Sequence, residues 1–431
     1  MYNRSGLLPA ITVVALAAAG ALAPVHAQVG TARLAGIEVV SNFEGGNVGK
    51  VEHVSPNHLR CAVQGQSDQD HRNRQADWYY FKLTNLARAP LTIDLVDLTG
   101  EYNYRSPAYS VTKGTRPVYS SDGVTWTHFS DSEVSWDEKE PHLTLHFVPT
   151  GDHIWIAHVP PYTNKDLAKL LDSFRGSPYL EIQSVGRTVE GREMPLLTIT
   201  NPKSRVSEKK VIWLMFRQHA WETGSSWTGD GAIRFLLSDD ERARRIRDEN
   251  IFKIFPMADP DGVATGGVRY NKNGYDLNRN WDTIDPHTMP EIAAQHKAIL
   301  NWVDSGHPIS LFLSLHNTES AEYFGAPAAD RALGERLFRI LTETTTFNPT
   351  VALRVEGDTT RPTEPGRMSA APGRMSVAQG LYHDRKIPAI LMEQMIEFNS
   401  KLGRCPQISD RQNFGAGLVQ AMATAVRKSA E

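Results

Sequence analysis

Short apolar runs fill the first part of the chain and are typical of β-strands. Between residues 37 and 159 they are separated by Gly, Pro, Asn and Asp, show no sustained helical period, and read IEVVSNF, DWYYFKLTNL, LTIDLVDL, LTLHFV and HIWIAHV. This pattern predicts an N-terminal antiparallel β-sandwich domain over residues 28–160. His142 and His146 fall on the polar face of one predicted strand, where we expect them to face solvent, because no third metal ligand accompanies them.

The pattern changes after residue 160. The segment TNKDLAKLLDSF has apolar residues three and four positions apart behind Thr163, which predicts a helix with a threonine cap. Strand-like and helical stretches then alternate, which favours an α/β domain over residues 161–431, built on a mixed or parallel sheet flanked by helices. Strands are predicted at 195–200, 211–216, 251–257, 309–315 and 387–392, and helices at 225–237, 290–303 and 331–342.

Residues 1–27 have the three parts of a secretory signal peptide. Arg4 gives a basic start, an apolar stretch covers residues 7–22, and Val-His-Ala at 25–27 is a small-residue cleavage site. The whole chain has 46 basic and 49 acidic residues, so its net charge of −3 becomes −4 once Arg4 is removed. This charge predicts no nucleic-acid partner, and no later apolar run is long enough to insert in a membrane. We therefore expect a periplasmic or secreted protein.

Cys61 and Cys405 are the only cysteines of the chain. Two cysteines in an exported protein can form one disulfide, although they are too few for a disulfide-based scaffold. We predict a Cys61–Cys405 bond that ties the β domain to the C-terminal segment.

Candidate chemistry lies after three of the predicted strands. His219 and Glu222 follow the run 211–216, a Gly-, Asn- and Asp-rich segment follows 251–257, and His316 follows 309–315. Ligands of α/β sheets bind outside the carboxyl ends of strands, where all three segments fall. Two histidines and one glutamate, with a fourth position left for water, are a catalytic zinc set. We expect one zinc ion per chain on these three residues.

The combination resembles the zinc carboxypeptidases, and within them the cytosolic-carboxypeptidase-like branch. The segments SNFEGGNVGKV, DWYYFKLTN, GTRPVYSSDGVTW and VPPYT are similar to the N-terminal domain of that branch. The segments GRTVEGREMPLLTIT, HAWETGSSW, PDGV, DLNRNW and LSLHN are similar to its catalytic domain. The resemblance covers nearly the whole chain after the leader, and implies a zinc-dependent carboxypeptidase that removes the C-terminal residue of peptides.

The resemblance also implies roles for residues beyond the metal ligands. Asn278 and Arg279 would hold the terminal carboxylate of the substrate, Arg269 would polarise the scissile carbonyl, and Glu393 would be the general base. These roles agree with the chemistry of the side chains, since a planar guanidinium matches a carboxylate and a carboxylate can take a proton from an attacking water. Glu397 is the competing candidate for the base. Asp276 is expected to orient the DLNRNW turn.

The chain departs from the family pattern in places that concern specificity. Ala220-Trp221 stands where the branch has Pro-Gly, so that Trp221 either packs in the core or narrows the pocket. Acid-preferring relatives have a basic residue before the catalytic glutamate, and Arg374 or Arg367 could contact the substrate there. His287 and Glu291 are expected on the surface at a helix start.

Two further functional hypotheses stay open. A zinc amidase or deacylase on the same fold could act on peptidoglycan peptides or small N-acyl substrates, and would not need to hold a terminal carboxylate. A metal-free binding module is disfavoured because all three ligands and a base are present. The preferred C-terminal residue, the natural substrate and the oligomeric state are not readable from the sequence.

Overall fold

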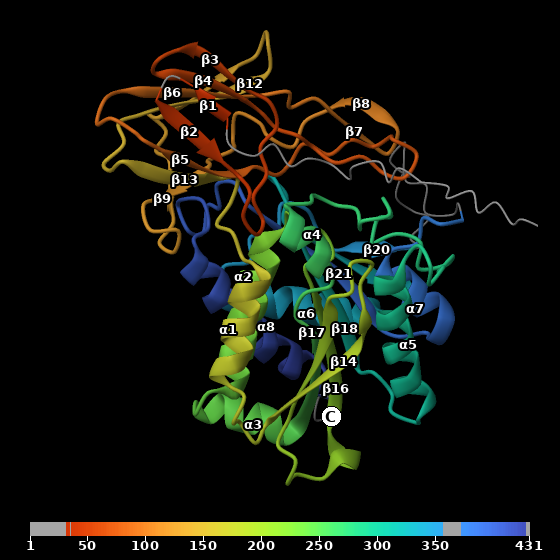
Figure 1. The fold of residues 1–431 in the computed structure, drawn as a ribbon. Coiled ribbons are helices and arrows are strands. Elements are labelled where there is room, and N and C mark those ends of the chain that lie inside the picture. Colours follow the sequence, from red (N-terminus) through yellow and green to blue (C-terminus); the bar gives the residue numbers. More distant parts are fainter. Residues whose placement is uncertain (1–31, 35, 357–371, 428–431) are drawn as a thin grey trace, which may run out of the picture.

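The computed structural model describes residues 32–34, 36–356 and 372–427 as two domains stacked on each other (Figure 1). The predicted leader and Arg367 lie outside the described residues. None of the helices within these ranges is long and apolar enough to cross a membrane.

The N-terminal domain is a β-sandwich, as predicted from its short apolar runs separated by Gly, Pro, Asn and Asp. Its two layers enclose one apolar core, which includes the fully buried Leu59, Phe81 and Ile93. One sheet has the order β1 (Ala32–Leu34), β2 (Ile37–Val40), β5 (Tyr80–Thr84), β13 (His153–Ala157), β9 (Val118–Ser120), β10 (Thr127–His128). The other has the order β11 (Val134–Asp137), β12 (His142–Phe147), β6 (Leu91–Val96), β4 (His58–Ala62), β3 (Val51–Ser55).

The sandwich is not wholly antiparallel. Strands β4 and β6 pair in parallel, because the chain between them crosses to the other sheet as β5 before it returns. A separate hairpin, β7 (Gly100–Tyr102) and β8 (Arg105–Ala108), extends from this domain. His146 is exposed and His142 is partly exposed, as predicted for the two strand histidines.

The second domain is built on one mixed eight-stranded sheet within the described ranges. Its order is β14 (Leu180–Arg187), β15 (Glu193–Ile199), β17 (Asn250–Phe255), β16 (Lys210–Phe216), β18 (Leu311–Thr318), β21 (Ala389–Met395), β19 (Tyr323–Pro327), β20 (Arg354–Glu356). The four central strands β17, β16, β18 and β21 run parallel, so their carboxyl ends meet at one edge. These buried strands are continuous apolar runs, as expected for a sheet covered on both faces.

Helices cover both faces of this sheet (Figure 1). One face packs against α1 (Asn164–Ser173), α2 (Thr223–Leu237), α3 (Glu241–Glu249), α6 (Arg331–Thr344) and α8 (Ile408–Ala425). The other face packs against α5 (Pro290–Asp304) and α7 (Val377–Arg385). Helix α1 begins as predicted: the Thr163 hydroxyl accepts from the Asp166 amide, and the Asp166 carboxylate accepts the Thr163 amide.

The surface position predicted for Glu291 is wrong. His287 is exposed as expected, but Glu291 is fully buried at the start of α5. Its carboxylate accepts the backbone N–H of Val189 at 3.0 Å and the side-chain amide of Asn271 at 2.9 Å. Two loops that fold over the helix start therefore supply the partners that a buried carboxylate needs.

The predicted disulfide is also contradicted. Both cysteines are free thiols: Cys61 is fully buried in the sandwich core, whereas Cys405 is partly exposed. The charges of Arg116 and Asp131 act on Cys405, which places it beside a different part of the N-terminal domain from the Cys61 core. The bond was predicted from the number of cysteines alone, which does not tell how far apart the two residues lie.

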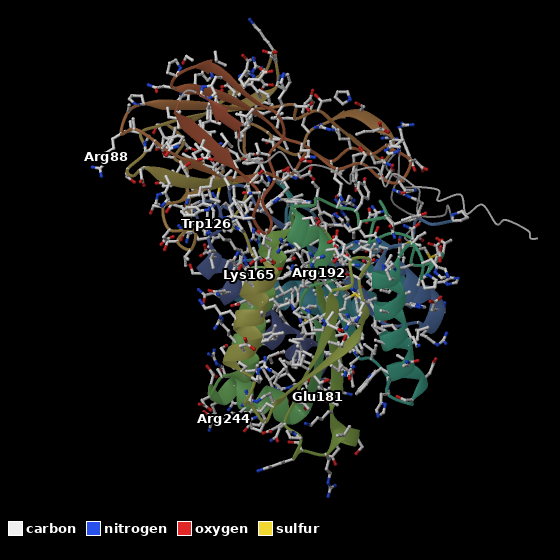
Figure 2. All side chains as sticks on the ribbon, viewed as in Figure 1. Arg88, Trp126, Lys165, Glu181, Arg192 and Arg244 are labelled. Atoms are coloured by element: carbon white, nitrogen blue, oxygen red, sulfur yellow. The ribbon has the colours of Figure 1, made fainter. Side chains whose placement is uncertain are left out.

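The β-sandwich lies over the carboxyl-end edge of the central strands (Figure 1). An aromatic cluster fills the junction and includes Trp78, Tyr80 and Trp221, with Trp126 packed against it (Figure 2). The Tyr80 and Trp126 rings meet edge to face at 5.7 Å. Backbone bonds such as Gly45 N–H to Ala264 O, 3.1 Å long, add polar contacts. The site described next is therefore closed by both domains.

Candidate active site

The three predicted metal ligands converge at the carboxyl-end edge. His219 lies in the loop after β16, Glu222 is the N-cap of α2, and His316 lies within β18. All three are at most 2% exposed. The Nδ1 atom of His219 lies 2.5 Å from one carboxylate oxygen of Glu222, and the Nδ1 atom of His316 lies 2.9 Å from the other. The ligand atoms all lie within 4.8 Å of one another, which suits a single ion.

The outward ring nitrogens are held by other side chains. His219 Nε2 lies 3.0 Å from Asp276 Oδ1, and His316 Nε2 lies 3.1 Å from Gln218 Oε1. The Asp276 carboxylate on Nε2 of His219 fixes the tautomer in which Nδ1 carries the lone pair, as a metal-ligating histidine requires. Two imidazole nitrogens and a carboxylate are a donor set that fits zinc.

Asp276 connects the metal ligands to Arg269. Besides contacting His219, the Asp276 carboxylate accepts hydrogen bonds from Arg269 Nε at 2.7 Å and from the backbone N–H of Asn278 at 2.9 Å. It therefore orients the turn, as predicted, and also links His219 to Arg269. Burial opposes ionisation, but the charges of Arg269 and His219 hold the pKa of Asp276 well below its usual value. Asp276 therefore stays anionic and fixes a ligand and an arginine together.

Glu393 faces the metal centre from the neighbouring strand. In the parallel pairing of β18 and β21 it is the register partner of His316. Within the part of the chain that the structure describes, one of its carboxylate oxygens has no hydrogen-bond partner, and the other lies 3.4 Å from the Tyr323 hydroxyl. Burial and the nearby Glu222 charge raise the pKa of Glu393 well above its usual value. The carboxylate oxygen without a partner is available to a water or to the substrate.

Glu397, the competing base, has a different environment. It follows the end of β21, and its carboxylate accepts the Thr112 hydroxyl of the β-sandwich at 2.8 Å. Its side chain also lies against Gly114, where an added Cβ would meet the carboxylate. These contacts make Glu397 part of the domain junction.

Two of the metal ligands, His219 and Glu222, line one cavity of about 300 Å³. Arg269, Asn278, Arg279 and Glu393 all contribute to its wall. An adjoining cavity of about 170 Å³ shares Arg269 and Arg279 and adds Arg374. The two adjoining cavities thus contain Asn278, Arg279 and Arg374, whereas Arg367 lies outside the described residues.

The polar partners of these residues differ. Asn278 is buried, with its carbonyl oxygen accepting the Val377 amide at 3.0 Å and its nitrogen 3.2 Å from His316 Nε2. Among the described residues, the Arg279 side chain donates one bond, to the carbonyl of Asn278 at 2.8 Å. With respect to these residues most of its donors stay available, so it is better suited than Asn278 to hold a carboxylate.

Trp221 packs in the core and also lines the pocket, so the two positions considered for it are not exclusive. It is 3% exposed and packs in the aromatic junction cluster, and its ring also lines the larger cavity. The β7–β8 hairpin supplies the opposite side through Tyr102, 43% exposed, whose ring lies 5.6 Å from the Arg269 guanidinium.

Gln66, from the β-sandwich, is a positioning residue that the sequence did not reveal. Its amide oxygen accepts the backbone N–H groups of Val268, Arg269 and Tyr270 at 2.9, 2.7 and 2.9 Å. Its amide nitrogen donates to the Tyr270 carbonyl at 2.8 Å. One side chain thus fixes three consecutive residues around Arg269, more than 200 positions away in the sequence.

We expect Gln66→Leu to lower kcat/KM by about 10- to 100-fold, because small misplacements of a catalytic group are costly. Zinc content should be unchanged, since none of the metal ligands contacts Gln66. Steady-state kinetics and metal analysis test this, with Gln64→Leu, on the exposed Gln64 nearby, as the control. Wild-type kinetics in Gln66→Leu would show that the loop holds Arg269 without it.

Comparison with known proteins agrees with this geometry. Residues 168–326 match the zinc carboxypeptidase family, and residues 39–159 match the cytosolic carboxypeptidase N-terminal domain. Cytosolic carboxypeptidase 3 of Mus musculus is 28% identical over 300 residues, covering 64% of this chain and 28% of that protein. Cytosolic carboxypeptidase 2 of Homo sapiens is 30% identical over 274 residues, covering 58% of this chain and 29% of that protein. The matches thus span under a third of these relatives.

A solved structure shares the fold of both domains. The metallo-carboxypeptidase of Burkholderia cenocepacia superposes with a TM-score of 0.75 at 23% identity, covering 90% of this chain and 99% of that one. The chain therefore carries a zinc carboxypeptidase domain behind a cytosolic carboxypeptidase N-terminal domain.

Proposed function

We propose that this protein is a zinc-dependent metallocarboxypeptidase that hydrolyses the C-terminal peptide bond of peptides. The observation that carries the proposal is one cavity lined by His219 and Glu222 of the ligand set and by Glu393, Arg269 and Arg279. It combines a metal site, a carboxylate with a free oxygen and two guanidinium groups. These are the parts that hydrolysis next to a free carboxylate needs.

The side chains suggest the following division of work. The Arg279 guanidinium holds the terminal carboxylate of the substrate as a planar fork. Arg269, fixed by Asp276 and by the Gln66-bound loop, faces the oxygen on which negative charge develops. Glu393 accepts the proton of the attacking water and returns it to the leaving amine. A zinc ion held by His219, Glu222 and His316 would supply Lewis-acid activation of that water and of the carbonyl.

Arg374 is proposed to meet the side chain of the C-terminal residue. It lines the adjoining cavity together with Arg279 and Arg269, and it is partly buried. A guanidinium in that position favours a carboxylate side chain. A mass-spectrometric screen against peptides that differ only in their C-terminal residue tests this, and equal cleavage of acidic and apolar ends would argue against the role.

The need for a free terminal carboxylate separates this function from the amidase alternative. We expect free-acid peptides to be hydrolysed at least about tenfold faster than the same peptides with a C-terminal amide, because a charge-assisted bond to Arg279 is worth roughly 1.5–3 kcal/mol. Arg279→Ala should raise KM for the free acid and change amide hydrolysis little. Kinetics on one such pair decide the matter. Equal rates on acid and amide would favour an amidase.

A further inference from the structure

The larger cavity has an acidic wall that the proposed reaction does not use. Asp77, from the segment leading into β5, and Glu319, from the segment after β18, both line it. Asp77 is 2% exposed, and one of its carboxylate oxygens has no hydrogen-bond partner among the described residues. The two domains each contribute one carboxylate to this wall.

The protein supplies little to balance these two carboxylates. The Ser110 hydroxyl lowers the pKa of both, but a hydroxyl has one hydrogen and can donate to only one carboxylate at a time. Arg269 and His219 are the cations whose charges act on Asp77, but Arg269 is already paired with Asp276 and His219 with Glu222. No lysine or arginine of the described residues forms an ion pair with Asp77 or Glu319.

The unfavourable burial of these two carboxyl groups raises their pKa values. Burial raises the pKa of Asp77 to about 6. Burial, with the charge of Asp77, raises the pKa of Glu319 to about 8. A buried carboxylate without a cation is unfavourable, and a ligand that brings a positive charge would remove the penalty.

The acidic wall lies where we expect the part of the substrate on the amino-terminal side of the scissile bond. The charges of His219 and Glu222 act on Asp77, so the wall borders the metal centre. Arg279 and Arg374 line the adjoining cavity, to which neither Asp77 nor Glu319 contributes. A substrate whose terminal carboxylate lies on Arg279 and whose scissile bond lies at the metal therefore continues toward Asp77 and Glu319.

We propose that Asp77 and Glu319 form a subsite for a cationic nitrogen of the substrate on the amino-terminal side of the scissile bond. This rests on the proposed carboxypeptidase function and adds a substrate class to it. The nitrogen is either the free α-amine of a dipeptide or the side chain of a basic penultimate residue. Both are cations that can donate to the free oxygen of Asp77.

The test compares kcat/KM within two matched pairs of free-acid peptides. One pair has lysine or Nε-acetyl-lysine before the C-terminal residue, and the other is a dipeptide with a free or an acetylated α-amine. We expect a preference of about 10- to 100-fold for the cation in at least one pair, as expected for one charge-assisted hydrogen bond. The pair that shows the preference identifies the source of the nitrogen.

Asp77→Asn and Glu319→Gln, nearly isosteric changes, should each bring the cation-to-neutral ratio toward one. Glu397→Gln is the matched control, because Glu397 is a neighbouring carboxylate whose charge acts on Glu319 but which does not line the cavity. It should keep the wild-type ratio, and melting curves show that each variant is folded.

The outcomes separate the subsite from the function on which it rests. Hydrolysis of the peptides without a preference for the cation, or a preference that survives in both Asp77→Asn and Glu319→Gln, would overturn the subsite alone. Loss of the preference in Glu397→Gln as well would attribute it to the general field of the junction and also overturn the subsite. No hydrolysis of any free-acid peptide would overturn both the subsite and the carboxypeptidase function.

Discussion

Glu393→Gln is expected to lower kcat by about 10²–10⁴-fold, which is the contribution of a positioned general base. This corresponds to roughly 3–5 kcal/mol of activation free energy at 1.36 kcal/mol per tenfold. The glutamine fits the same space, and its amide oxygen can still face the Tyr323 hydroxyl, so folding should be unchanged. It cannot accept a proton from water. Steady-state kinetics with metal analysis should show full zinc content, a KM close to that of the wild type and little turnover.

Glu397→Gln is the control for this substitution. Its carboxylate accepts the Thr112 hydroxyl at the domain junction, so kcat should stay within a few-fold of the wild type. A dead Glu397→Gln beside an active Glu393→Gln would show that the base was assigned to the wrong residue.

His316→Ala is expected to abolish zinc binding and with it peptide hydrolysis. Loss of an outer hydrogen-bond partner already costs about 10–100-fold in metal affinity, so loss of a ligand should cost more. The fold should survive, because the apolar cores on both faces of the sheet do not depend on the site. The deleted ring removes the partner of one Gln218 atom, Oε1, and of one Asn278 atom, Nδ2, so some loss of thermal stability should follow.

Metal analysis beside a melting curve checks this result. His146→Ala is a suitable control, since His146 is an exposed histidine of the sandwich whose ring lies 3.1 Å from the Thr92 hydroxyl. It should keep one zinc per chain and full activity. Full zinc occupancy in His316→Ala would mean that the third ligand is another residue.

Local patterns predicted the parts of the structure that depend on neighbours in the sequence. The alternation of runs predicted the sandwich and the α/β domain, and the ends of the predicted strands indicated His219, Glu222 and His316, whereas Glu393 was inferred from the family resemblance. The carboxyl ends of parallel strands meet at one edge whatever the rest of the fold is, which is why these residues could be brought together in advance. The strands are shifted slightly: β18 and β21 extend past His316 and Glu393.

Contacts between the two domains could not be predicted in this way. Both Gln66 and Asp77 belong to the sandwich; Gln66 binds the loop that carries Arg269, and Asp77 lines the catalytic cavity. No local spacing marks a glutamine that binds a loop 200 residues away. The Cys61–Cys405 pairing failed for the same reason, since it too depends on where distant segments meet.

The pairing of His316 with Glu393 has a consequence for how this site tolerates change. Along β21, Ile390 and Met392 face the core under α2 and α8, whereas Ala389 and Glu393 face the other side. Side chains alternate strictly along a strand, so one residue inserted between Ala389 and Glu393 would turn the carboxylate into that apolar core. Two inserted residues would restore its face but move it by about 7 Å along the strand. The catalytic distance is therefore encoded in the length of β21, and substitutions that preserve this length should be tolerated far better than insertions or deletions.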